Sequence, residues 1–263
     1  MDYQEIAYER RGRGAWIRLQ RPDALNTLTP TLVAEMDRAL DGAMADPTVI
    51  AVVVTGTGRA FCAGADLKFL GELPQEQRAQ RTSEFLESVL RVMLRLERFP
   101  KPVIAAVNGI ATGGGMELLL CCDLVIASEE ARLGDGHANF GLLPGGGASV
   151  RLPRKIGPTR AKYLLFTGEL VAPAQLLAAG LVNEVAPPAG LDAAVERLIG
   201  KLSNKSPLGL RRMKELVDDG LEQGKETALR LELLASALHA QSYDMQEGVA
   251  AFNGKRKPEF QGR

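Results

Sequence analysis

Hydrophobic and polar positions follow two different periods along this chain. Near the N-terminus they alternate at the two-residue period of a β-strand, most clearly over 15–19, which predicts a hairpin followed by a loop at 21–24. Short uninterrupted apolar runs predict buried strands at 52–56, 103–107 and 123–127. A further short strand is expected around 132–134. The first half of the chain therefore contains several short strands that are buried on both faces.

Helical periodicity separates these strands. Thr29 and Pro30 form a typical pair of N-cap and first helical residue, and the apolar positions after them predict a helix that ends near Met44. The charged, amphipathic stretch from about 75 to 98 predicts a long helix closed by prolines. Glycine runs at 113–115 and 145–147 are expected to open two more helices. This alternation of strands and helices predicts an α/β fold.

The pattern changes near Lys201, beyond which only helices are predicted. Three helical stretches remain, at 206–218, 224–240 and 243–253. A tail of this size buries little apolar surface by itself, so we expect it to pack on the main domain or on a neighbouring subunit. The predicted organisation is a core domain over 1–200 and a helical C-terminal region over 201–263.

Composition excludes several classes of protein. Hydrophobic residues make up 46% and charged residues 24% of the 263 positions, which is ordinary for a globular chain. The 32 basic residues balance the 32 acidic ones, which argues against nucleic acid as a partner. No apolar stretch is long enough for a signal peptide or a membrane span, so a cytoplasmic protein with no membrane partner is expected.

The cysteines and the glycine clusters are candidates for different kinds of chemistry. Cys62, Cys121 and Cys122 have no zinc-ligand spacing and make a poor disulfide framework, so we expect reduced, buried thiols and no metal. The turn at 63–66 and the glycine run at 113–115 can expose backbone N–H groups, which suit the stabilisation of negative charge on a reacting carbonyl oxygen. Each glycine cluster alone is equally typical of a tight turn.

Taken in order, several segments resemble the crotonase (enoyl-CoA hydratase/isomerase) family over nearly the whole chain. They are Arg21-Pro22-Asp23-Ala24-Leu25-Asn26, Ala60-Phe61-Cys62-Ala63-Gly64-Ala65-Asp66-Leu67, Val107-Asn108-Gly109 with Gly113-Gly114-Gly115-Met116-Glu117-Leu118, and Phe140-Gly141-Leu142-Leu143-Pro144-Gly145-Gly146-Gly147. The tail from Glu247 to Phe252 with Lys255 to Pro258 is similar to the family's C-terminal helix. The resemblance implies a spiral of ββα turns and a helical C-terminal region that builds homotrimers, often paired into hexamers. It implies an acyl-CoA thioester as partner, with coenzyme A as part of the substrate and no prosthetic group.

The resemblance also assigns roles to individual positions. The Ala65 and Gly114 amides match the family's oxyanion hole. The remaining matches concern coenzyme A: the adenine-binding loop at Ala63, Ala65, Asp66 and Leu67, the pantetheine channel at Ala24 and Leu25, phosphate contacts at Lys68 and Lys255, and Phe252 in the C-terminal helix. Lysine suits phosphate as a point charge, although it is also the commonest surface residue.

The acid/base positions combine a match and a departure. Glu117 follows the oxyanion glycines by about one helical turn and matches one of the two glutamates of the family's hydratases. His137 occupies the position of the second glutamate, and its titration range suits proton transfer near neutral pH. If the segment is extended, Asp135 lies on the same side as His137 and can orient the imidazole. His239 is interpreted as structural.

Several reactions are compatible with these residues. The leading hypothesis is an enzyme of the enoyl-CoA hydratase type in which Glu117 and His137 carry protons. A double-bond isomerase, a thioester or β-diketone hydrolase, and a catalytically silent acyl-CoA-binding protein are the alternatives, because the glutamate pair is broken at His137. Dinucleotide-binding and P-loop enzymes are excluded, since neither glycine motif occurs. The acyl group is not specified by any residue pattern.

Overall fold

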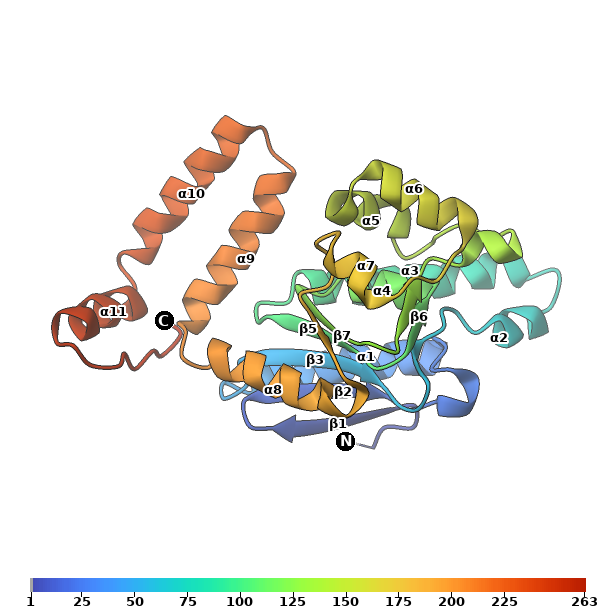
Figure 1. Ribbon diagram of the computed structural model, residues 1–263, viewed down its shortest axis with the longest axis horizontal. Coiled ribbons are helices and arrows are strands. Elements are labelled where there is room, and N and C mark those ends of the chain that lie inside the picture. Colours follow the sequence, from blue (N-terminus) through green and yellow to red (C-terminus); the bar gives the residue numbers. More distant parts are fainter. Residues whose placement is uncertain (1) are drawn as a thin grey trace.

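Six strands form the main sheet of the computed structural model, which describes residues 2–263 (Figure 1). In spatial order they are β1 (Ile6–Arg11), β2 (Gly14–Leu19), β3 (Ala51–Gly56), β5 (Val103–Val107), β7 (Leu124–Ser128) and β9 (Glu184–Ala186). β1 and β2 form the predicted antiparallel hairpin, and the remaining neighbours pair in parallel. The strands predicted from uninterrupted apolar runs are confirmed, and all residues of β3 and β5 are buried.

A second sheet runs through three short parallel strands, β4 (Ala60–Cys62), β6 (Ile110–Thr112) and β8 (Arg132–Gly134). Each of them directly follows a strand of the main sheet in the sequence, and helices come between successive strand pairs. This repeated ββα arrangement confirms the predicted α/β fold. Only β8 was predicted from the sequence, since three-residue strands carry too short a pattern to recognise.

Helices connect and cover the sheets. They are α1 (Pro30–Ala45), α2 (Leu67–Glu72), α3 (Arg78–Glu97), α4 (Gly114–Leu120), α5 (Ala148–Ile156), α6 (Pro158–Thr167), α7 (Pro173–Leu177) and α8 (Leu191–Leu202), with 3-10 turns η1 (Pro22–Ala24), η2 (His137–Phe140) and η3 (Pro188–Gly190). The predicted N-cap is confirmed, because the Thr29 hydroxyl accepts a hydrogen bond of 3.0 Å from the Leu32 amide. The long helix begins at Arg78, and the separate short helix α2 before it was not predicted.

Apolar clusters lie on both faces of the main sheet. On one face Ile17, Val52 and Val54 pack in a cluster that also takes in residues of α1, α3 and α4. On the other face Trp16 and Val53 pack with residues of α8. Burial on both faces explains why these strands read as continuous apolar runs instead of alternating patterns.

All three cysteines are free and buried, which confirms the prediction of reduced thiols. Burial raises the pKa of Cys62 and of Cys121 to about 12. Burial also raises the pKa of Cys122. Thiols with such pKa values are unreactive at neutral pH.

The C-terminal region is helical, as predicted, and consists of α9 (Pro207–Leu221), α10 (Lys225–His239) and α11 (Tyr243–Asn253). Figure 1 shows α9 and α10 side by side, extending away from the sheets. Lys214 on α9 contacts the core through an ion pair of 2.9 Å with Asp123. His239 lies 3.0 Å from Arg212 across the helix pair, in agreement with a structural role. Among residues 2–263, no helix combines the length and apolarity needed to cross a membrane.

Candidate active site

The carboxyl ends of the three short strands meet at one edge of the second sheet. Strand pairing places Cys62 opposite Ala111 and Thr112 opposite Gly134, so the chain leaves all three strands at about the same level. The segments that follow these ends are 63–66, 113–117 and 135–137. Every position matched to the oxyanion hole or to acid/base chemistry lies in one of these segments. The topology therefore brings together residues that are far apart in the sequence.

Ala65 and Gly114 place their backbone amides beside a common space. A Cβ added to Gly114 would lie 3.5 Å from the Ala65 nitrogen, and one added to Gly64 would lie 3.2 Å from the Gly114 nitrogen. Gly64 has a φ of 101°, which favours glycine at this turn. Within the described residues, neither the Ala65 nor the Gly114 amide donates a hydrogen bond to the protein. Both N–H groups remain as donors for a ligand oxygen.

Glu117 lies one turn into α4 and is buried. Its Oε1 atom accepts hydrogen bonds from the Gly146 amide at 2.7 Å and from the Ala148 amide at 3.0 Å. Burial raises the pKa of this carboxyl, and the two amides together with the nearby charge of His137 oppose that shift only in part. The carboxyl is therefore fixed in position and holds a proton more readily than an exposed glutamate.

Arg151 holds the loop that binds Glu117, and sequence reasoning missed it. Its guanidinium donates to the Gly146 carbonyl at 2.7 Å and makes a bidentate pair with Glu97 at 3.0 and 2.8 Å. A Cβ added to Gly146 would lie 2.7 Å from Oε2 of Glu117, so the loop approaches the carboxyl too closely for a side chain. The available signal was an arginine in the first turn of a helix opened by three glycines.

His137 lies in the same site and is paired with Asp135. The histidine side chain is 13% exposed, and its Nδ1 atom lies 2.9 Å from each carboxylate oxygen of the buried Asp135. The predicted pairing is therefore present, but the extended backbone expected for it is wrong. Gly136 adopts a left-handed φ of 73°, and His137 begins the 3-10 turn η2. A Cβ added to Gly113 would lie 3.8 Å from Cε1 of His137, which places the imidazole beside the glycine run.

The charges around His137 favour its protonated form. Burial of the imidazole disfavours the charge, but the hydrogen bond to Asp135, the charge of Asp135 and the charge of Glu117 outweigh it and raise the pKa of His137. Glu117 and His137 thus perturb each other's titration. Perturbed neighbouring groups of this kind are typical of acid/base sites.

The positions matched to coenzyme A fall into two groups in space. The loop with Ala24 and Leu25 lies against the turn at 63–66, because the Ala63 amide donates to the Leu25 carbonyl at 3.0 Å. Asp66 caps α2 and pairs with Arg21 at 2.9 Å. Leu67 and Lys68 follow at the exposed start of α2. These residues therefore adjoin Ala65.

Phe252 and Lys255 form the second group. Phe252 is 84% exposed near the end of α11, and Lys255 is exposed just beyond that helix. Figure 1 shows α11 and α2 on opposite sides of the molecule. The structure therefore does not bring these two residues to the site of their own chain.

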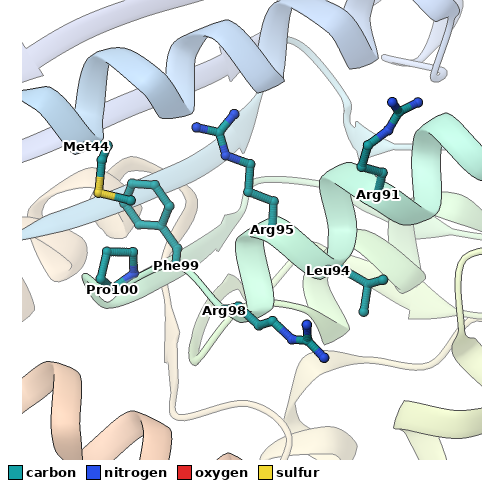
Figure 2. Close-up of a pocket in the computed structure, with 7 residues that line it drawn as sticks. All are labelled: Met44, Arg91, Leu94, Arg95, Arg98, Phe99 and Pro100. Atoms are coloured by element: carbon teal, nitrogen blue, oxygen red, sulfur yellow. The ribbon is translucent and has the colours of Figure 1, made fainter.

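An open depression between α1 and α3 lies apart from this site (Figure 2). It has a volume of about 280 Å³ and contains none of the predicted site residues; its lining comprises Met44, Arg91, Leu94, Arg95, Arg98, Phe99 and Pro100. Arg95 is neutralised by Asp37 and Asp41 of α1, and Figure 2 shows Arg98 pointing away from Arg91 and Arg95. The arginines do not converge on one point.

Comparison with known proteins identifies the family. Residues 11–263 match the sequence model of the family described as Enoyl-CoA hydratase/isomerase. The chain is 36% identical to the crotonyl-CoA hydratase of Syntrophomonas wolfei, over 99% of each chain. It is 36% identical to the 2,3-dehydroadipyl-CoA hydratase of Escherichia coli, over 98% of this chain and 99% of the relative. The crystal structure of enoyl-CoA hydratase from Bacillus anthracis is similar, with a TM-score of 0.93 and 35% identity, over 99% of this chain and 100% of that one. The chain therefore belongs to the enoyl-CoA hydratase/isomerase family, also called the crotonase family.

Proposed function

We propose that this protein adds water across the double bond of a trans-2-enoyl-CoA thioester. One arrangement carries the proposal. The backbone amides of Ala65 and Gly114, which donate no hydrogen bond within the described residues, lie in the same site as a buried carboxyl and an imidazole paired with a carboxylate. The named hydratases among the relatives, at 36% identity over nearly their full lengths, support hydration over isomerisation or hydrolysis.

Each group has a distinct role in this reaction. Glu117, held by Gly146 and Ala148, removes a proton from water as the oxygen attacks C3 of the enoyl group. The electron pair of the double bond moves toward the thioester carbonyl, whose oxygen becomes negative and accepts hydrogen bonds from Ala65 and Gly114. Protonated His137 then delivers a proton to C2. Return of the proton from Glu117 to His137 restores both groups, so the net result is one water added to the substrate.

The coenzyme A moiety is proposed to bind along the two adjoining loops. Ala24 and Leu25 would contact the pantetheine, and backbone groups at Ala63, Asp66 and Leu67 would contact the adenine. Lys68 supplies positive charge for a phosphate at the exposed start of α2. Coenzyme A enters here as part of the substrate.

A homotrimer, alone or paired into a hexamer, is proposed as the working assembly. Helix α10 has no buried residue in the single chain and exposes Leu229, Leu233, Leu234 and Leu238. Exposed apolar surface on this scale is typical of a subunit interface. In such an assembly Phe252 and Lys255 would approach the coenzyme A of a neighbouring subunit, since they do not reach the site of their own chain.

The test is hydration of a short and a medium trans-2-enoyl-CoA, followed by the absorbance of the conjugated thioester. We expect the absorbance to fall with wild-type protein, and Glu117→Gln and His137→Ala each to slow the fall by about 10²–10⁴-fold. Folded wild-type protein that binds coenzyme A but leaves the absorbance unchanged would refute hydration. Assays for movement of the double bond and for release of free thiol would then distinguish isomerisation from hydrolysis.

A further inference from the structure

We propose that Asp135 is a positioning residue that holds His137 through Nδ1, so that Nε2 carries the transferred proton, and that its negative charge favours the imidazolium form. The inference rests on the proposed role of His137. It explains how a histidine can replace a carboxylic acid at this position.

The geometry leaves one nitrogen for chemistry. Both carboxylate oxygens of Asp135 lie 2.9 Å from Nδ1 of His137, and an ionised carboxylate only accepts hydrogen bonds. Nδ1 must therefore carry a hydrogen and donate it to Asp135. Within residues 2–263, Nε2 makes no hydrogen bond to the protein. The pairing selects Nε2 as the atom that exchanges a proton with the substrate.

The backbone of Asp135 is fixed as firmly as its side chain. Its carbonyl accepts hydrogen bonds from the Thr112 hydroxyl at 3.1 Å and from the Gly113 amide. Its carboxylate also accepts the amide of His137 at 3.2 Å. Gly136 closes the turn with a left-handed φ, and a Cβ there would collide with the Thr112 hydroxyl. Asp135 therefore links the imidazole to the residue that precedes the Gly114 amide.

Histidine and a carboxylic acid differ in the charge they carry before and after giving up a proton. Among the described residues, the titratable groups that act on His137 are Asp135, after strand β8, and Glu117, on α4. An imidazolium that gives up its proton becomes neutral beside Asp135, whereas a carboxylic acid becomes negative beside Glu117. The neighbouring negative charges therefore favour the proton-loaded imidazole, and they raise the pKa of His137. Activity should consequently be lost on the alkaline side when His137 loses its proton.

The direct test follows the His137 imidazole by NMR. The chain has only two histidines, so His239→Gln leaves a single imidazole to titrate. In that background Asp135→Asn keeps the size and the accepting oxygen but removes the charge. We expect the pKa of His137 to fall by about one unit or more, since an opposite charge at this distance shifts a pKa by roughly 1–3 units. The alkaline limb of kcat against pH should move down by the same amount.

A second measurement needs no substitution at Asp135. In the His239→Gln protein above the pKa of His137, imidazole nitrogen shifts report which ring nitrogen keeps the hydrogen. Nδ1–H is expected, and Nε2–H would overturn the proposal even if Asp135→Asn failed to fold. An unchanged His137 pKa in folded Asp135→Asn would also overturn it. Neither NMR result depends on turnover, so failure of this inference is distinct from failure of the proposed hydration.

Discussion

Arg151 donates a hydrogen bond of 2.7 Å to the carbonyl of Gly146, the residue whose own amide binds Glu117 at 2.7 Å. Arg151 is buried, and within the described residues its hydrogen bonds go to Gly146 and Glu97 and not to the carboxyl of Glu117. Arg151 therefore acts on Glu117 through a single residue, Gly146. The position of the proposed base thus depends on an ion pair between α5 and α3, formed with Glu97.

Arg151→Met should weaken both stability and activity. The substitution preserves much of the volume but removes the bonds to Gly146 and Glu97, and hydrogen bonds to charged groups contribute about 1.5–3 kcal/mol each. Glu97 is 35% exposed, so water can solvate its carboxylate once the guanidinium is removed. We therefore expect a loss of only about 1–3 kcal/mol in the free energy of unfolding. The turnover of enoyl-CoA should fall roughly tenfold or more as the Gly146 loop loosens.

Arg154→Met is the matched control for this prediction. Arg154 lies one turn further along α5 and is exposed, with an ion pair of 3.2 Å to Glu222. Its substitution should change the free energy of unfolding by less than about 0.5 kcal/mol and leave turnover unchanged. Urea unfolding and steady-state kinetics on both variants check the pair. Equal effects at the two positions would show that the contact with Gly146 has no special role.

Glu117→Gln should lower the activity and raise the thermal stability, and the gain in stability should depend on pH. Burial raises the pKa of Glu117, so the folded chain binds this proton more tightly than the unfolded chain. That contribution to stability is complete below the ordinary pKa of glutamate and is lost as the pH rises through the raised value. Glutamine has no ionised form, so the variant should have a higher Tm than wild type at about pH 8, and the difference should vanish toward about pH 4. A variant Tm below that of wild type at about pH 8 would contradict the raised pKa of Glu117.

The main sheet and the candidate site differ in how far the sequence predicts them. Strands such as 52–56 are buried on both faces and have a strong apolar pattern, and the N-cap at Thr29 has its own local signature. By contrast, β4 and β6 contain three residues each, and their pairing depends on partners about 50 positions away. The pairing of Asp135 with His137 was expected from an extended segment and occurs through a left-handed glycine instead. Arg151 was missed because its partners, the Gly146 carbonyl and Glu97 on α3, follow from tertiary packing and not from a local pattern.

Gly114→Ala should damage the proposed oxyanion site while leaving the fold intact. The added methyl group would lie 3.1 Å from Cδ1 of Leu28 and 3.5 Å from the Ala65 nitrogen, between the two donor amides. The amide of residue 114 is kept, but the methyl group would obstruct the approach of the carbonyl oxygen to the donors, and loss of one oxyanion contact costs about 10²–10³ in kcat. Gly200→Ala on α8 is the control, because a Cβ there meets nothing within 4 Å. The control should keep full activity and gain about 0.5–1 kcal/mol in the free energy of unfolding. Similar kinetics for both variants would argue against the role of Gly114.

The exposed apolar face of α10 is the surface through which the proposed trimer would assemble. Leu229 and Leu233 lie one turn apart and are 51% and 72% exposed in the single chain. The double variant Leu229→Glu, Leu233→Glu places two charges on that face without removing a buried side chain, so each subunit should still fold. Sedimentation should show monomers where wild type forms trimers.

The same double variant also tests the proposed location of Phe252 and Lys255. If these residues serve a neighbouring subunit, dissociation raises KM for the acyl-CoA substrate, and Lys255→Ala in the intact trimer raises KM in the same direction. Lys257→Ala is the control, since Lys257 is an exposed lysine two positions further on. Monomers with an unchanged KM would show that each chain binds coenzyme A by itself, through the loops at 24–25 and 63–68 alone.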